Sequence, residues 1–250
     1  MILRQHYHDF HCFLINDNST DQTTDILKNY LGNDPRFTFF SLTEPKLSQG
    51  PADARNLGIS HVSTPLTAFC DIDDLWHPSK LEKQVPFHLH NNLDISVSSF
   101  YRFNLATRLL SSAIIIPPSK ITFLRVLGNN PIPMLTVLVR TSLIQSGFPP
   151  CRHEDHALWI SLFSVNPYLR YSVFPQPLAY YAQHSDNITR SNLKMILWAL
   201  DLRSYLQLPM PIYFFSLLYF ILSHMLSHLV SNIRPRIRIR SIDSMMTSEL

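Results

Sequence analysis

The feature that most constrains this chain is a short apolar run that leads into a polar, acid-rich loop and then into a helical segment. Residues 10–15 (FHCFLI) form one such run and residues 66–70 (LTAFC) form another. Runs that are apolar throughout are typical of strands buried on both faces of a parallel sheet. The repeated order of strand, loop and helix therefore predicts an α/β fold. Its acidic loops should lie at the carboxyl ends of the strands, the edge at which open α/β sheets bind ligands.

The same patterns divide the chain into a sheet-containing body and a helical tail. Strands are expected at residues 10–15, 36–42, 66–70, 95–116, 134–140 and 171–181, and helices at residues 23–30, 52–60, 80–88, 121–127, 143–148, 153–164, 192–208 and 212–233. We expect a mostly parallel sheet flanked by helices in a first domain, residues 1–190. A helical and basic C-terminal segment, residues 191–250, should follow it.

The composition agrees with a globular protein and excludes several other classes. Of the 250 residues 46% are hydrophobic, which is enough to build a core and argues against disorder. The formal net charge of +3 is too small to indicate a nucleic-acid partner. Cys12, Cys70 and Cys151 are too far apart to indicate a disulfide framework or a zinc knuckle. We therefore expect reduced thiols in a cytosolic chain.

The densest acidic segment is Asp71-Ile72-Asp73-Asp74, which directly follows an apolar run. Three carboxylates within four residues repel one another, and a cation would offset that repulsion. Carboxylate oxygens suit Mg²⁺ or Mn²⁺, which are often held by one or two carboxylates together with substrate phosphates. A solvated turn or a helix N-cap explains the segment equally well.

Three other polar segments also have ordinary structural explanations. Residues 16–21 (NDNSTD) can form an Asx-turn and a helix cap. Arg55 follows a Gly-Pro turn and has a binding role only if it faces a phosphate, which a guanidinium binds through two parallel hydrogen bonds. Glu154 and Asp155 can simply complement the dipole in the first turn of a helix. The order of the segments decides more than any one of them does.

That order resembles one known family. The segments are residues 13–21 (FLINDNSTD), 50–59 (GPADARNLGI), 68–82 (AFCDIDDLWHPSKLE) and 147–159 (GF, then EDHALW). Together they resemble the motifs of the family-two glycosyltransferases, inverting enzymes of GT-A fold, and the similarity covers roughly residues 1–185. The resemblance implies sugar transfer from a nucleotide-sugar donor to a glycan or lipid-linked acceptor. Surface polysaccharide or lipopolysaccharide synthesis is the expected setting.

The resemblance also implies roles for individual residues. The residue that matches Asp17 contacts the nucleoside base, and those that match Asp73 and Asp74 lie at the ribose and at a divalent metal, Mn²⁺ or Mg²⁺. Asp155 matches the carboxylate base that deprotonates the acceptor hydroxyl. Arg55, with the metal, would stabilise the departing nucleoside diphosphate.

Several features depart from the family pattern. Asn16 stands where the family usually has the first Asp, and Asn18 where it has Gly. His184 falls where the family often carries a Y-R-x-H segment near the metal, but Ala182 replaces the arginine here. Family members begin with an apolar strand and a helix before the position of Met1, and residues 1–7 resemble only the end of that helix. Either the true start lies upstream of Met1, or this is a truncated copy, in which case the sheet lacks a central strand that lines the nucleotide site. A truncated, non-catalytic remnant or binding protein is therefore the alternative function.

The C-terminal segment has the pattern of a membrane-associated helix. Residues 212–233 carry an apolar stripe opposite serines and histidines, and Arg234, Arg236, Arg238 and Arg240 follow. This combination is typical of a helix that lies at an anionic membrane surface, and predicts a cytoplasmic protein held at the inner face of the plasma membrane. Alternatively, the helix packs on the body and the arginine-rich tail forms a solvated edge strand.

Overall fold

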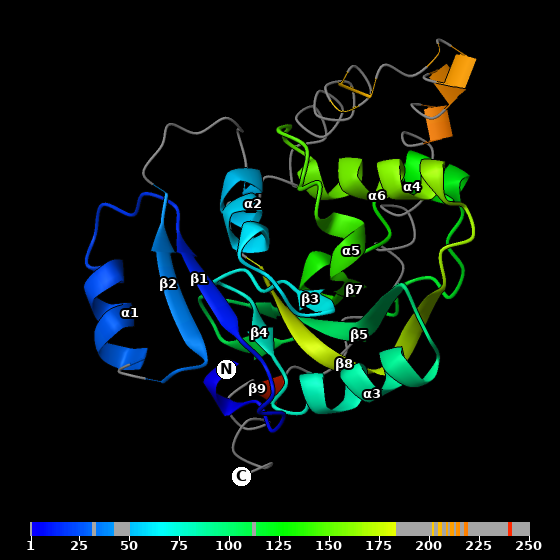
Figure 1. Cartoon of the computed structure of the whole chain (residues 1–250). Coiled ribbons are helices and arrows are strands. Elements are labelled where there is room, and N and C mark those ends of the chain that lie inside the picture. Colours follow the sequence, from blue (N-terminus) through cyan, green and yellow to red (C-terminus); the bar gives the residue numbers. More distant parts are fainter. Residues whose placement is uncertain are drawn as a thin grey trace.

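The computed structural model describes residues 2–31, 34–42, 51–111 and 114–183. It also describes single positions of the C-terminal segment, namely residues 202, 205, 206, 209, 211, 212, 214, 215, 218, 219, 240 and 241. These residues form two β-sheets with helices packed around them (Figure 1).

The smaller sheet has two strands. β1 (Cys12–Asn16) pairs in parallel with β2 (Phe37–Ser41), and α1 (Thr23–Leu31) connects them. α2 (Ala52–Ser60) packs on β1, where a Cβ at Gly58 would lie 3.6 Å from the Ile15 side chain. In the described part of the chain β1 pairs only with β2, so this sheet is separate from the larger one.

The larger sheet is built around β5. Its strands are β3 (Leu66–Ala68), β4 (Leu75–Trp76), β5 (Ile95–Asn104), β6 (Leu109–Leu110), β7 (Leu138–Arg140), β8 (Tyr171–Gln183) and β9 (Arg240–Ser241). β5 pairs in parallel with β8, but β7 runs antiparallel to both β3 and β5. The sheet is therefore mixed, and the expectation of mostly parallel pairing was wrong for this part. An apolar run has the same pattern in either strand direction, so the sequence does not distinguish the two.

Helices cover both faces of the larger sheet (Figure 1). α3 (Lys80–His90) packs on β5 and β8 from one side. On the other side lie α4 (Phe123–Gly128), α5 (Thr141–Ile144) and α6 (Glu154–Val165), with α4 packed against α6. The expected strand at residues 134–140 divides into a 3₁₀ turn, η2 (Met134–Thr136), and the short β7. Pro133, which has no N–H to donate, precedes the turn.

The main hydrophobic core lies between α6 and β5. Trp159 and Phe163 of α6 are buried against Ile95 and Val97 of β5 and Val126 of α4. No residue of the two strands of the small sheet is fully buried: all are half-buried except Ser41, which is exposed. The tightly packed part of the molecule is therefore the part that carries α6.

The two ends of the chain attach to the larger sheet. Residues Ile2–Arg4 form a 3₁₀ turn, η1, and the buried Gln5 amide donates to the His77 carbonyl at 2.7 Å and accepts from Leu81 N at 3.1 Å. At the other end, β9 pairs with β6, which agrees with the edge-strand alternative for the tail. Most of the two expected C-terminal helices lies outside the described residues. No helix in the described ranges has the length and apolar character needed to cross a bilayer.

Candidate active site

The loop after β1 is ordered by its own side chains. Asn16 donates to Thr24 Oγ1 at 3.1 Å and accepts from Ser19 N at 3.0 Å, while Asp21 Oδ1 accepts from Thr23 N at 3.0 Å. Asn18 has a φ of 56°, in the left-handed region that a short polar side chain tolerates. The turn-and-cap explanation is thus confirmed for Asn16 and Asp21. Asp17 lies between them, at the carboxyl end of β1.

The acidic segment after β3 is tied to β8. Asp74 is buried, and its Oδ1 accepts a hydrogen bond from Ala182 N at 2.9 Å. Burial, together with the negative charges of Asp74, Asp73 and Asp71, raises the pKa of Tyr181. Three carboxylates therefore act on the Tyr181 hydroxyl. A buried carboxylate fixed by a backbone N–H is suited to hold a cation through its other oxygen.

Among the described residues, no group of three or more metal-ligating side chains comes together. The carboxylates of the acidic segment after β3 still fit Mg²⁺ or Mn²⁺, because such ions are often held by only one or two carboxylates together with substrate phosphates. The expected further ligand, His184, lies outside the described residues, immediately after β8.

Arg55 joins three segments that are far apart in the sequence. Its guanidinium, on α2, is hydrogen-bonded to Glu154 at the start of α6 and donates to Asp71 Oδ1 at 3.0 Å. It also lies 5.4 Å from the centre of the Phe148 ring. Only 10% of the Arg55 side chain is exposed. Burial alone would lower the pKa of Arg55, but Asp71, Glu154 and Asp155 together raise it.

Glu154 is the buried partner in this cluster. Burial raises the pKa of Glu154 to about 7, the neighbouring Asp155 charge adds to the increase, and Arg55 opposes it. The Arg55–Glu154 pair therefore anchors the first turn of α6 to α2. Arg55 was predicted to face the donor diphosphate, but in this structure its hydrogen-bonding groups are directed to two carboxylates.

The turn before α6 is held to α2 by a second contact. Asn56 donates to the Phe148 carbonyl at 2.9 Å and accepts from Phe148 N at 2.6 Å. Gly147 has a φ of 82°, and a Cβ at this position would lie 2.8 Å from Asn56 Oδ1. A side chain there would disturb this pair of hydrogen bonds. The A-R-N and G-F motifs are thus in direct contact.

Asp155 follows Glu154 and is half-exposed. Its Oδ2 accepts from Asn130 Nδ2 at 2.8 Å, and its Oδ1 accepts from His156 N at 2.7 Å. Asn130 belongs to none of the four motifs, and no role was predicted for it from the sequence. A half-exposed carboxylate with a fixed orientation can accept a proton from a hydroxyl group that approaches from solvent.

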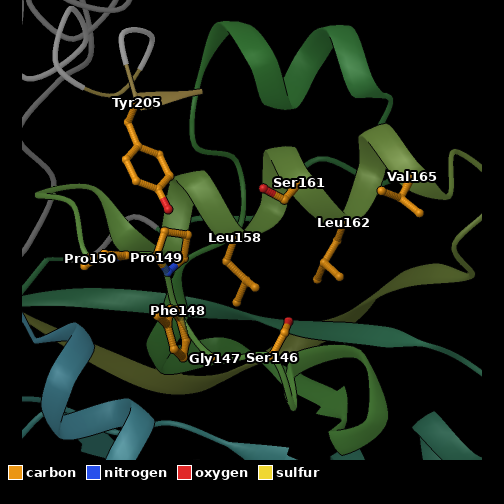
Figure 2. Close-up of a pocket in the computed structure, with 10 residues that line it drawn as sticks. All are labelled: Ser146, Gly147, Phe148, Pro149, Pro150, Leu158, Ser161, Leu162, Val165 and Tyr205. Atoms are coloured by element: carbon orange, nitrogen blue, oxygen red, sulfur yellow. The ribbon is translucent and has the colours of Figure 1, made fainter. Parts of the chain in front are cut away.

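A pocket of about 430 Å³ lies between the turn at residues 146–150 and one face of α6 (Figure 2). Leu158 and Leu162 point from α6 toward this turn, and Tyr205 closes the side near Pro149 and Pro150 (Figure 2). Its lining is apolar apart from Ser146 and Ser161. None of the acidic residues described above lines it.

Comparison with known proteins relates this chain to glycosyltransferases. The sequence model of the family described as "Glycosyl transferase family 2" matches residues 1–143. An uncharacterized glycosyltransferase of Haemophilus influenzae is 31% identical over 221 residues, which cover 86% of this chain and 85% of that protein. The Escherichia coli protein WfgD, a UDP-Glc:alpha-D-GlcNAc-diphosphoundecaprenol beta-1,3-glucosyltransferase, is 31% identical over 66% of this chain and 62% of its own. The chain spans only about a quarter of the Rickettsia relatives, with 24% of the Rickettsia bellii protein matched.

Solved structures show the same fold. The S. aureus protein TarS in complex with UDP has a TM-score of 0.61 at 19% identity, over 88% of this chain and 64% of that chain. The mannosyltransferase PcManGT of Pyrobaculum calidifontis, in complex with GDP-Man and Mn²⁺, has a TM-score of 0.59 at 14% identity, over 87% of this chain and 62% of its own. At these identities the likeness concerns the fold, and it confirms the GT-A architecture expected from the sequence.

Proposed function

This chain belongs to glycosyl transferase family 2, and we propose that it transfers a sugar, with inversion, from a nucleotide-sugar donor to a glycan or lipid-linked acceptor. One observation carries the proposal. Arg55 connects α2, the acidic segment after β3 and the first turn of α6, so that three of the four motifs meet around one guanidinium. Glu154, which precedes Asp155, and Asp71 of the acidic segment are thereby bound to a single cation.

In the proposed site the donor lies along the carboxyl ends of β1 and β3. Asp17 contacts the nucleoside base, Asp73 the ribose, and Asp74, with His184, a divalent cation, Mn²⁺ or Mg²⁺. The TarS structures with UDP and with UDP-GlcNAc, and the PcManGT structure with GDP-Man and Mn²⁺, support this class of donor and cofactor. When bound, the cation would supply positive charge that stabilises the leaving diphosphate.

Asp155 acts as the general base. Its carboxylate takes the proton of the acceptor hydroxyl while the hydroxyl oxygen bonds to C1 of the sugar, and the bond from C1 to the diphosphate oxygen breaks. Asn130 and His156 N hold the carboxylate in place. Arg55 stabilises the negative charges of Glu154 and Asp71 beside it.

The acceptor is proposed to be lipid-linked, as in the synthesis of surface polysaccharide or lipopolysaccharide. The names of the E. coli proteins WfgD and WfaP state that they act on alpha-D-GlcNAc-diphosphoundecaprenol, and these proteins are 31% and 26% identical to this chain. A putative teichuronic acid biosynthesis glycosyltransferase of Bacillus subtilis, TuaG, is 32% identical over 64% of this chain.

A lipid-linked acceptor calls for contact with the membrane, and we place this contact on the C-terminal segment, residues 191–250. Ile212, Phe214, Phe215, Leu218 and Tyr219 are each at least 42% exposed. Clustered exposed apolar side chains followed by arginines are typical of binding to an anionic surface. The protein would then be cytoplasmic and held at the inner face of the plasma membrane. The protein should sediment with phosphatidylglycerol vesicles but not with phosphatidylcholine vesicles, and equal binding to both would exclude the electrostatic part.

The direct test is Asp155→Asn. The variant keeps the size and one of the two hydrogen-bond acceptors of the side chain but cannot take a proton, so turnover should fall by about 10²-fold or more. Binding of UDP with Mn²⁺, measured as a thermal shift, should stay within error of the wild type. Glu82→Asn, an exposed acidic residue on α3, is the control for loss of one charge. Full turnover in Asp155→Asn would mean that another group is the base.

The alternative is a non-catalytic remnant or binding protein that keeps the fold but not the donor site. The two functions differ in a measurable way. A remnant shows neither turnover with any nucleotide sugar nor a Mn²⁺-dependent thermal shift with UDP or GDP, whereas the enzyme shows both.

A further inference from the structure

The two oxygens of the Asp155 carboxylate are held from different directions. His156 N, within the same helix turn, donates to Oδ1 at 2.7 Å. Asn130 Nδ2, which is 25 residues away in the sequence, donates to Oδ2 at 2.8 Å. Two bonds to two different oxygens fix both the position and the plane of the carboxylate group.

Asn130 is itself held in place. Its Oδ1 accepts from Ile132 N at 3.4 Å, and the Ile132 side chain is completely buried. The preceding helix, α4, is joined to α6 because His156 Nε2 bonds to the Val126 carbonyl. The loop that carries Asn130 and the helix that carries Asp155 therefore form one packed unit.

We propose that Asn130 is a positioning residue for the transfer step, holding the Asp155 carboxylate in the orientation from which it accepts the proton of the acceptor hydroxyl. This inference rests on the proposed function of Asp155. Asn130 does not touch the reacting atoms, and acts only through the carboxylate.

The charges around Asp155 explain why such a residue is needed. Arg55 interacts electrostatically with Asp155, and its guanidinium donates hydrogen bonds to Glu154 and Asp71. An Asp155 side chain released by Asn130 can therefore turn toward Arg55 and away from the acceptor. A neutral amide donor prevents this turn, and it neither gives up a proton nor adds a charge at the base.

The first experiment is Asn130→Ala with Asn129→Ala as the matched control. Asn129 is the exposed neighbouring residue at the end of α4. Misplacement of a catalytic group by about 1 Å can cost about 10²-fold in rate, so kcat of Asn130→Ala should fall about 10- to 100-fold. The donor KM and the thermal shift with UDP and Mn²⁺ should not change. An unchanged kcat, or a loss in kcat equal to that of Asn129→Ala, overturns the proposal.

The second experiment separates positioning from a purely structural role. Asn130→Asp places a carboxylate against Asp155, and two adjacent carboxylates share one proton and titrate as a pair. The acid limb of the pH–rate profile should then move by about one pH unit or more to higher pH. Asn129→Asp adds the same charge outside the contact and should not move it. Identical profiles for the two variants contradict the proposal.

A readout without turnover keeps this inference separate from the proposed function. The side-chain ¹³C signal of Asp155 can be followed by NMR across a pH titration, and Asn130→Asp should move its midpoint where Asn129→Asp does not. A moved midpoint in a protein without transferase activity supports the contact but rejects the proposed function. An unmoved midpoint in an active protein rejects the role of Asn130 alone.

Discussion

The central strand of the larger sheet, β5, is less apolar than β1 of the smaller sheet, yet it is the more deeply buried of the two. β5 includes three serines in its first five residues, and all of its first six residues are buried. β1 (CFLIN) is more apolar, and all five of its residues are only half-buried. Burial therefore follows the neighbours of a strand and not its own hydrophobicity.

The neighbours of the two strands explain the difference. β5 pairs with β6, β7 and β8 and is covered by α3. Within the described residues β1 pairs with β2 alone and is covered by α2. The proposed base and its supports lie on the compact side, while Asp17, the proposed contact for the nucleoside, lies on the open side. Stability should thus depend mainly on the sheet built on β5, whereas the nucleoside end of the donor should depend on the sheet built on β1.

The largest expected effect comes from a matched pair of substitutions, Ile95→Ala in β5 and Ile15→Ala in β1. Ile95 is completely buried, so its loss should lower the free energy of unfolding by about 2–5 kcal/mol. Ile15 is half-buried, and its loss should cost less than about half as much. Urea unfolding of both variants gives the two values. Equal losses would mean that the two sheets are packed equally well.

The next prediction concerns His88 of α3, which lies against β5. Burial lowers the pKa of His88 to about 4, and the nearby Arg140 charge adds to the decrease. The unfolded chain then binds a proton near pH 6.5 and the folded chain only near pH 4. Stability from this group is therefore lost as the pH falls through this window. The expected loss is about 1–3 kcal/mol between pH 7 and pH 4.

The matched variant for this prediction is His88→Gln, whose amide can still bond to Ser96 Oγ as the His88 ring does at 3.0 Å. Glu154, with its pKa raised to about 7, has the opposite effect, because the folded state binds its proton first and gains stability as the pH falls from 7 to 4.5. Both proteins contain Glu154, so the difference in the free energy of unfolding between wild type and His88→Gln at each pH removes the Glu154 contribution. A difference that does not change with pH would contradict the assignment to His88.

The sequence predicted those parts of the fold that local patterns encode. The helix at residues 52–60 has the expected bounds, and the acidic loops lie at the ends of β1 and β3 as predicted. The strand directions around β7 were not predicted, because direction depends on connections far apart in the chain. For the same reason the contacts of Arg55 with Glu154 and Asp71 were not predicted, and its role at the donor diphosphate stays a prediction.

Asn130 shows which part of the candidate site could not be predicted from the sequence. Its partner is 25 residues away, and nothing in the segment Asn129-Asn130-Pro131 marks a link to a helix that begins after it. A side chain that acts through one tertiary hydrogen bond has no periodicity or local spacing by which it can be recognised. Asn56, by contrast, was within a quoted motif, although its contact with Phe148 was not predicted.

The smallest expected effect concerns the sheet formed by β1 and β2. It is measured by amide hydrogen exchange with and without UDP and Mn²⁺. Without ligand, amides of β1 and β2 should exchange faster than those of β5, because few packed neighbours oppose local opening. A ligand slows only those openings that break its site, in proportion to its occupancy. At a ligand concentration of about ten times the dissociation constant, exchange in β1, β2 and the loop at residues 17–22 should therefore slow by up to about tenfold, with β5 unchanged.

The control variant is Asp74→Asn, which keeps an oxygen for Ala182 N but removes the charge. It should abolish the part of the slowing that requires Mn²⁺. Equal slowing in β5 and β1 would mean that the ligand stabilises the whole molecule, and that the two halves do not open separately.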